Sequence, residues 1–313
     1  MRRLLIIQPC WDHSEVLGGV LHYCKNQNIM VKIIYNWDRE EGNYIDYYLE
    51  LYKMDDLVRK INYKSPKHHL KELRWANKIL FVDSIHLVKF LSKNEIKKCM
   101  NKIITINHIE KRVKYDIKVI LLGIKPYERC INERKYLISS YYNPKVGLSV
   151  LNERKRYLIV GNPEERNIEW LESLEGDYEL DYVHRNELEI VNKRVRVHKK
   201  IDTKSLIGLI KGCDFIITLF KSDSVYMRDR ICGIIAFSVS FGKPLIMDKD
   251  YSNIVDIESD LVYENNIEDF KSVFNRSLEY ENNAYLKLSK RIMEYRNIKI
   301  QEQYLNLNLV FDI

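Results

Sequence analysis

Two continuous apolar runs separated by a polar loop constrain this chain more than any other feature of its sequence. The runs are residues 215–220 and 244–247, and between them the sequence predicts a loop that holds Arg228, Asp229 and Arg230, followed by a helix. Strands in which nearly every residue is apolar are typical of parallel sheets that helices cover on both faces. The loop is therefore expected at the carboxyl end of a parallel strand, where open α/β sheets bind their ligands.

The length of the chain favours two domains of this kind. A chain of 313 residues is long for one core and suits two domains of about 150 residues each. In the first half, apolar runs predict strands that alternate with helices, at residues 4–8, 30–35, 78–82, 103–106 and 119–122. The pattern breaks over residues 127–151 into tyrosines, serines, Asn-Pro and Gly, so this segment is the predicted linker and the first domain is placed at residues 1–145.

The second half resumes the alternation. Strands are predicted at residues 157–160, 180–183, 195–198, 215–220, 244–247 and 261–263, and helices at 167–174, 205–210 (with Asp202 as its cap) and 267–278. This domain is placed at residues 146–285, which makes the fold class α/β with two Rossmann-like, doubly wound domains. A helical tail, residues 286–313, follows. It could pack on the second domain or cross back to the first, and the sequence leaves both open.

Several classes of protein are excluded by simple patterns. No run of about 18 apolar residues is present, so no membrane span is expected. The apolar run after Arg2 and Arg3 is too short for a secretory signal and lacks a small-residue cleavage site. Six cysteines are scattered singly, which indicates reduced thiols in a cytoplasmic protein.

Positive charge is concentrated in the first half. The net charge is +7, and residues 53–118 contain 17 lysines and arginines against 7 aspartates and glutamates. Such a region suits an anionic membrane surface, a nucleic acid or an acidic substrate, although solvated helix faces would give the same count. No basic-aromatic motif of a nucleic-acid module accompanies it, so nucleic acid is the less favoured partner.

The second half resembles the nucleotide-sugar domain of GT-B-type glycosyltransferases, specifically the group 1/family 4-like type. Residues 157–171, Tyr-Leu-Ile-Val-Gly-Asn-Pro-Glu-Glu-Arg-Asn-Ile-Glu-Trp-Leu, are similar to the strand-Gly-Arg-loop-Lys-Asn-helix segment that opens this domain. Residues 206–248 resemble the later signature that ends in Gly-Lys-Pro. The resemblance implies two domains facing across a cleft and the metal-independent transfer of a sugar from a nucleotide-sugar donor to a glycan, lipid-linked or other acceptor, with no cofactor.

The chain departs from the family pattern at specific positions. The family has two glutamates separated by seven residues; here Asp229 stands at the first and Phe237 at the second. Its Gly-Arg is Gly161-Asn162, and its lysine is Arg166. Phenylalanine cannot accept a hydrogen bond from a ribose, so the usual donor contact is absent or supplied elsewhere.

The resemblance assigns donor-binding roles to residues at the ends of strands. Arg166, Arg228 and Arg230 are expected to hold the diphosphate, because guanidinium groups bind two phosphate oxygens at once. Gly161, beside Asn162, would let the backbone approach the phosphates, and Gly233 would begin a helix whose N-terminus adds its dipole. Surface ion pairs with nearby carboxylates such as Asp229 are the alternative. We expect Arg166→Ala to abolish nucleotide binding while leaving the fold intact.

The first domain would bind the acceptor. An inverting transferase needs a general base, and Asp12, His13 and His108 each follow a predicted strand. A retaining enzyme needs no such base, and a histidine in a loop is more often structural. The sequence does not decide between these cases.

Three other functions are weighed against this one. A catalytically inactive sugar- or nucleotide-binding protein with the same fold is favoured by Phe237, and a nucleic-acid-binding protein by the basic half. Residues 12–19, Asp-His-Ser-Glu-Val-Leu-Gly-Gly, loosely resemble zinc-dependent N-acetylglucosaminyl deacetylases. The chain lacks the leading histidine and the later His-x-x-His of that family, so the three zinc ligands are not found.

Overall fold

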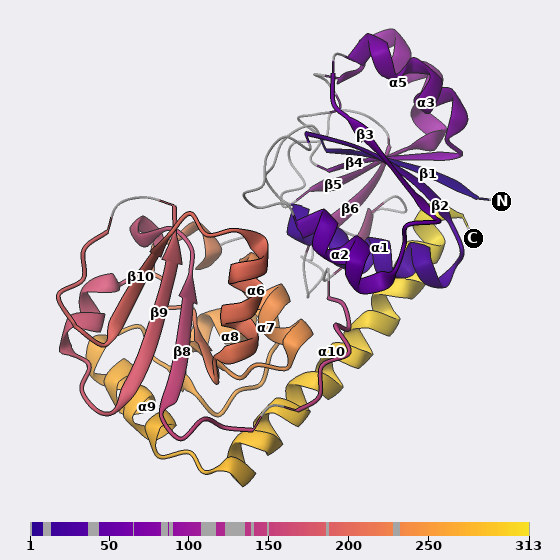
Figure 1. Ribbon diagram of the computed structural model, residues 1–313. Helices are drawn as coiled ribbons and strands as arrows, with labels where there is room; N and C mark the ends of the chain where they lie inside the picture. The colour runs from indigo at the N-terminus through magenta and orange to yellow at the C-terminus, as the bar shows by residue number, and fades with distance from the viewer. Residues whose placement is uncertain are drawn as a thin grey trace. The chain divides into compact units, whose positions relative to one another are not determined.

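The chain folds into two compact units, each built on one parallel sheet flanked by helices (Figure 1). The computed structural model describes residues 2–8, 14–36, 44–64, 66–82, 87, 90–107, 117–122, 135–138, 141–148, 150–185, 188–227 and 232–312. The first unit comprises Met1–Tyr142 and Ile300–Ile313, and the second Asn143–Lys299. The fold class predicted from the sequence, α/β with two Rossmann-like domains, is confirmed.

The described part of the first unit has a sheet of seven parallel strands in the order β3-β2-β1-β4-β5-β6-β7. The strands are β1 (Arg3–Gln8), β2 (Met30–Tyr35), β3 (Val58–Asn62), β4 (Lys78–Val82), β5 (Ile103–Asn107), β6 (Lys118–Leu122) and β7 (Lys135–Ile138). The helices are α1 (Leu17–Asn26), α2 (Tyr44–Tyr52), α3 (Leu70–Trp75) and α5 (Lys93–Cys99), with 3₁₀ turns η1 (Ser14–Val16), η2 (Pro66–His69) and η3 (Met100–Lys102).

Alternate strand residues of this sheet build a core with the helices after β3 and β4. Leu5, Ile34 and Phe81 lie on one face of the sheet and pack with Leu73 of α3 and Ile96 of α5. α5 begins with a reciprocal cap, in which the Ser92 hydroxyl accepts from the backbone N–H of Glu95 and the Glu95 carboxylate accepts from that of Ser92.

The described part of the second unit has a sheet of six parallel strands in the order β10-β9-β8-β11-β12-β13. The strands are β8 (Lys155–Val160), β9 (Tyr178–His184), β10 (Val195–Lys199), β11 (Phe215–Ile217), β12 (Leu245–Asp248) and β13 (Val262–Tyr263). The helices are α6 (Thr203–Gly212), α7 (Gly233–Phe241), α8 (Lys249–Val255) and α9 (Ile267–Leu278), with 3₁₀ turns η5 (Pro163–Glu165), η6 (Ile168–Ser173) and η7 (Val225–Met227).

Polar side chains and one glycine fix the helix ends of this unit. The Asp202 carboxylate accepts from the Ser205 N–H at 2.8 Å and starts α6, as the sequence predicted. Asn266 caps α9 in the same way. Gly242 ends α7 in the left-handed conformation, with φ of 64°, where a Cβ would lie 2.7 Å from the Met293 side chain.

The tail is one long helix, α10 (Asn282–Phe311), of which residues to Lys299 belong to the second unit and residues from Ile300 to the first. In the second unit, Arg296 Nη1 donates to the Ser240 carbonyl at 2.8 Å, at the end of α7. In the first, the Tyr304 hydroxyl lies 2.7 Å from His22 Nδ1 of α1. Among the described residues, no helix combines the length and the apolar character needed to cross a bilayer.

Some predicted elements are wrong in extent or type. The strand predicted at 215–220 ends at Ile217, because Leu219 adopts a left-handed φ of 51° and turns the chain. The helix predicted at 167–174 is the 3₁₀ helix η6. The predicted linker at 127–151 contains β7, which pairs with β6 in the first sheet. β3 was not predicted at all, because charged residues interrupt its apolar pattern.

Candidate functional site

The strand order of the second sheet reverses between β8 and β11, which are neighbours. From β8 the chain builds outward through β9 and β10, then returns to β11 on the other side. Loops after two such strands leave in opposite directions and open a crevice at the carboxyl edge, where ligands of this class of sheet bind. The loop after β8 contains Gly161, Asn162 and Arg166, so these predicted residues lie at the reversal.

Arg166 connects the loop after β8 with the loop after β11. Its side chain is fully buried, with 0% exposure. Nη2 donates to the Val160 carbonyl at 2.5 Å and Nη1 to the Asn162 carbonyl at 3.1 Å. The guanidinium carbon lies 5.0 Å from the centroid of the Phe220 ring, and the backbones of Arg166 and Phe220 form an antiparallel bridge. Arg166 is thus a structural element of the site, which revises the expectation that its removal would leave the fold intact.

No ion pair with Arg166 is found in the part of the chain that the structure describes. Among the residues that the structure describes, no carboxylate lies within ion-pair distance of it, and its Nε has no hydrogen-bond partner. Nη2 also lies 3.8 Å from the sulfur of Cys232, the residue that precedes α7. Helix N-termini carry partial positive charge. A guanidinium and a helix N-terminus therefore lie together where an anion would be stabilised by both.

Gly161 makes this arrangement possible. Its φ of +128° is outside the range that residues with a side chain adopt, and a Cβ would lie 2.6 Å from Arg166 Nη2. The Tyr182 hydroxyl donates to the Gly161 carbonyl at 3.2 Å. The close approach that the sequence assigned to a phosphate is made in the structure by the arginine itself.

An aromatic group that the sequence did not indicate lies beneath the arginine. The Phe220 ring meets Tyr251 edge-on, with centroids 4.7 Å apart, and stacks on Tyr226 at 4.9 Å. The Tyr251 hydroxyl accepts a hydrogen bond from the Cys232 N–H at 3.2 Å, which links α8 to the start of α7. Tyr251 lies 19 residues after Cys232, and Arg166 more than 50 residues before Phe220, so no local pattern could have grouped them.

Asp248, at the end of β12, lies at the same carboxyl edge and was not singled out in the sequence. Its Oδ1 accepts from the N–H groups of Asp250 and Tyr251 at 2.8 and 3.1 Å and so caps α8. Burial raises the pKa of its carboxyl group. A signal was available, since Asp248 directly follows an apolar run that ends at the carboxyl edge.

α7 presents its N-terminus to this edge and its side chains to the core. Gly233 is the first residue of the helix, and the preceding Cys232 supplies no side-chain cap. Phe237, which stands where the family has its second glutamate, is 4% exposed and belongs to the buried side of the helix. A buried phenylalanine at this position offers no hydrogen-bond acceptor to a ribose hydroxyl.

Six of the predicted site residues lie outside the described residues. Three precede α7: Arg228, Asp229 and Arg230. Three belong to the first unit, where Asp12 and His13 follow β1 and His108 follows β5. These two strands are parallel and separated only by β4, so both end at the carboxyl edge of the first sheet.

The two glycines of the deacetylase-like segment have a packing role. A Cβ on Gly18 would lie 2.8 Å from the Tyr48 ring, and one on Gly19 would lie 2.2 Å from Gln303 Nε2. They allow α2 and the C-terminal part of α10 to approach α1. Among the described residues, no group of three histidine, cysteine or acidic side chains is arranged to hold a metal ion.

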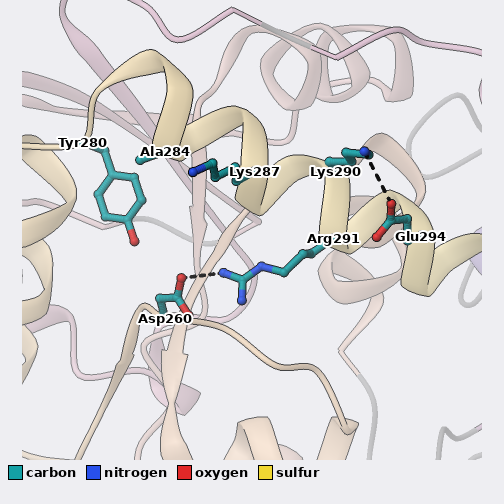
Figure 2. Close-up of a pocket in the computed structure, with 7 residues that line it drawn as sticks. All are labelled: Asp260, Tyr280, Ala284, Lys287, Lys290, Arg291 and Glu294. Atoms are coloured by element: carbon teal, nitrogen blue, oxygen red, sulfur yellow. Dashed lines mark hydrogen bonds and ion pairs between the residues drawn. The ribbon is translucent and has the colours of Figure 1, made fainter.

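A pocket of about 420 Å³ lies elsewhere in the second unit, and Figure 2 shows its lining residues. Asp260 precedes β13 and Tyr280 follows α9, so the pocket is at the amino edge of the sheet. Its charges are largely paired, since Arg291 bonds to Asp260 and Lys290 lies 3.9 Å from Glu294. Its position and its charge pairing distinguish it from the carboxyl-edge site.

Comparisons with solved structures agree with this architecture. No protein-family model matches the chain, and no curated protein matches it in sequence. The chain is similar in structure to HepE of Anabaena, solved with UDP and glucose, with a TM-score of 0.67, 9% identity and 100% of each chain covered.

Two further structures, one from E. coli and one a galactosyltransferase, extend this similarity. An E. coli trehalose-6-phosphate structure with UDP-2-fluoroglucose gives a TM-score of 0.60, with 10% identity and 99% of each chain covered. The lipopolysaccharide outer core galactosyltransferase WaaB gives 0.56, with 13% identity and 100% of this chain and 99% of that one covered. At such low identity the similarity concerns the fold, and the chain has a GT-B-type fold of two Rossmann-like domains.

Proposed function

We propose that this protein is a glycosyltransferase that transfers a sugar from a nucleotide-sugar donor bound at the carboxyl edge of the second sheet. One observation carries the proposal. Arg166, fully buried and without a carboxylate partner among the described residues, lies beside the N-terminus of α7 at the strand-order reversal. A buried, uncompensated cation is costly, and an anion at this position would remove that cost.

The diphosphate of a nucleotide sugar is the anion that the fold and the chemistry favour. During transfer, the bond between the anomeric carbon and the diphosphate oxygen breaks, and the diphosphate keeps the electron pair. The developing negative charge would be stabilised by the N–H groups at the start of α7 and by the charge of Arg166. Arg228 and Arg230, which precede α7 in the sequence, are proposed to contact the phosphate oxygens directly.

The acceptor hydroxyl, on a glycan or a lipid-linked sugar, attacks the anomeric carbon and loses its proton. Asp12, His13 and His108 are the candidates to receive that proton if the configuration inverts, because their loops share the carboxyl edge of the first sheet. The reaction proposed needs no metal and no cofactor, since the charge stabilisation comes from protein cations. Activity that survives a chelator would support this.

The solved structures support a uridine nucleotide as donor. HepE was solved with UDP-glucose and with UDP, and the E. coli structure with UDP-2-fluoroglucose. We therefore expect UDP or a UDP-sugar to bind the second domain. A ligand at 100 times its dissociation constant adds about 2.7 kcal/mol to the stability of the domain it binds.

Thermal unfolding with a panel of nucleoside diphosphates and their sugars tests the proposal. A shift with one base and not with the others would name the donor, and isothermal calorimetry would give its affinity. Arg230→Ala is expected to weaken that affinity at least tenfold without changing the unfolding temperature of the free protein. Full affinity in Arg230→Ala, or no shift with any nucleotide, would contradict the proposed site.

A binding protein without turnover is the second candidate, and Phe237 favours it. Phe237 is buried, so the family's second carboxylate is replaced by a core side chain. This candidate predicts nucleotide binding without hydrolysis of the donor or transfer to any acceptor. Release of nucleoside diphosphate from a bound donor would exclude it.

A further inference from the structure

A tryptophan at the amino edge of the first sheet is surrounded by cations. Trp75 is the last residue of α3 and lies just before β4. Lys32 Nζ lies 4.4 Å from the centroid of its ring, and Arg3 Cζ lies 5.8 Å from it. Arg59 of β3 is directly opposite Lys32 in the parallel register, so a further cation joins the group.

The cations outnumber the carboxylates that could neutralise them. Burial lowers the pKa of Lys32, and the nearby charges of Arg59, Lys71 and Arg3 lower it further, while Glu72 acts in the opposite direction. Glu72 is 4% exposed and lies 3.9 Å from Lys71 Nζ, so one buried carboxylate serves several cations. Like charges gathered this closely repel one another, and an external anionic group would relieve the repulsion.

The same surface carries apolar side chains next to its charges. Leu70 is 42% exposed and is the first residue of α3, followed by the exposed Lys71. Arg74 is four positions after Leu70 and shares its face of the helix. Trp75 is half-buried, with its ring against the cations. Exposed leucine and tryptophan flanked by lysine and arginine are the side chains that suit a bilayer interface.

We propose that this surface, formed by Lys32, Arg59, Leu70, Lys71, Arg74 and Trp75, binds an anionic lipid bilayer. The lysines and arginines would contact lipid phosphates, while Leu70 and the edge of Trp75 enter between the headgroups. The Lys32 ammonium group occupies one face of the indole ring. The Trp75 ring is therefore poorly suited to stack on a nucleic-acid base. The exposed leucine likewise has no role against a phosphate backbone, so a membrane is favoured over a nucleic acid.

This inference does not rest on the proposed transferase activity. The proposed nucleotide site is on the sheet of the second unit, whereas Trp75 lies at the amino edge of the first sheet, because α3 leads into the start of β4. Small ligands of parallel sheets bind at the opposite, carboxyl edge. Membrane binding and nucleotide binding can therefore be gained or lost independently.

Flotation of the full chain with vesicles tests the proposal. Vesicles of phosphatidylcholine alone are expected to leave the protein in solution, and vesicles containing phosphatidylglycerol to carry it upward. Each basic residue near an anionic surface contributes a factor of about five in affinity. Lys71→Ala/Arg74→Ala should therefore bind about 25-fold more weakly to the anionic vesicles. The matched control is Lys287→Ala/Lys290→Ala, which removes the same charge from exposed positions of the second unit and should bind as the unchanged protein does.

The apolar part of the proposal has its own test. Leu70→Ser should weaken vesicle binding without altering the unfolding temperature. Brominated lipids should quench the tryptophan fluorescence of the unchanged protein more than that of Trp75→Phe. Equal vesicle affinity of the Lys71→Ala/Arg74→Ala and control variants would overturn the proposal. The proposal would also be overturned if the protein did not bind anionic vesicles but did bind an oligonucleotide. Loss of that oligonucleotide binding in Lys71→Ala/Arg74→Ala would identify a nucleic-acid interface instead.

Discussion

Two regions of this protein place a cation against an aromatic ring, and they differ in what surrounds the cation. In the second unit, Arg166 lies 5.0 Å from the Phe220 ring, fully buried and held by two backbone carbonyls. In the first, Lys32 Nζ lies 4.4 Å from the centroid of the Trp75 ring, with other cations around it. The contacts are alike in distance, yet the Arg166 side chain is fully buried and Lys32 is only partly buried.

Burial decides what each cation can do. Arg166 has a fixed direction and little solvent screening, so it suits one anion at one position. The lysines and arginines around Trp75 keep their mobility, and salt screens their charges. They therefore suit a surface on which many anionic groups occupy no fixed positions. The difference predicts a specific ligand for the second unit and a nonspecific anionic surface for the first.

Replacing Arg166 by alanine should have the largest effect, because the buried site depends on it. Two carbonyls would lose charged donors, each worth about 1.5–3 kcal/mol, so the second unit should lose about 3 kcal/mol of unfolding free energy. Nucleotide affinity should fall by at least tenfold, as calorimetry would measure. The control is Arg194→Ala, since Arg194 is exposed and also lies near an aromatic ring, 5.9 Å from that of Tyr178. Equal stability of the two variants would contradict the structural role of Arg166.

Gly161→Ala tests the same site without removing a charge. The new Cβ would lie 2.6 Å from Arg166 Nη2 at a φ of +128°, so we expect a loss of about 2 kcal/mol and a displaced guanidinium. Gly208→Ala is the matched control. Gly208 lies inside α6 with no atom within 4 Å of the added Cβ, so this change should stabilise the protein by about 0.5–1 kcal/mol. A neutral Gly161→Ala, measured by chemical denaturation, would show that the loop is not held as described.

Salt should weaken ligand binding at the two regions to different extents. Between 0.1 and 1 M salt the screening length falls from about 10 Å to about 3 Å. Binding to anionic vesicles should weaken by more than about tenfold over this range, whereas nucleotide binding to the buried site should change by less than about threefold. Parallel titrations of vesicle flotation and of calorimetric nucleotide binding would measure both. A vesicle affinity that does not depend on salt would remove the electrostatic basis of the Trp75 surface.

The smallest expected effect concerns His184, at the carboxyl end of β9. Burial lowers the pKa of its imidazole, and Lys199 lowers it further. The folded state thus binds this proton less readily than the unfolded state, whose pKa is about 6.5. As pH falls below about 6.5 the unfolded state gains the proton first, so the stability of the second unit should decrease until the folded pKa is passed. His184→Gln should reduce the decrease between pH 7 and pH 5 in thermal unfolding, and an unchanged slope would contradict the assignment.

Much of the secondary structure could be predicted because its signals are local. β2 (Met30–Tyr35) and α9 (Ile267–Leu278) have the predicted bounds, since continuous apolar runs, helical periodicity and caps mark them. β3 was missed because charges fill most of its exposed positions at the edge of the sheet. β7 was missed because the polar residues around it were taken for a linker.

The candidate site could be predicted only in part. Arg166 and Gly161 follow a predicted strand, and they were selected by the resemblance to the nucleotide-sugar domain together with the rule that parallel sheets bind ligands at their carboxyl edge. Phe220 is predicted as part of a strand. No local sequence pattern predicts its contacts with Arg166 and Tyr251. The buried state of Arg166 was unforeseen, because arginines in loops are usually exposed.

The sequence by itself determined the alternation of strands and helices, the two-domain α/β class and which loops follow the carboxyl ends of the strands. These follow from hydrophobic periodicity and strand direction, which are encoded within a few residues of one another. Only the tertiary structure decided that Arg166 is enclosed while Lys32 is not. Burial depends on the segments that pack against a side chain, and here Arg166 meets Phe220 and Cys232, which lie more than 50 residues after it in the chain.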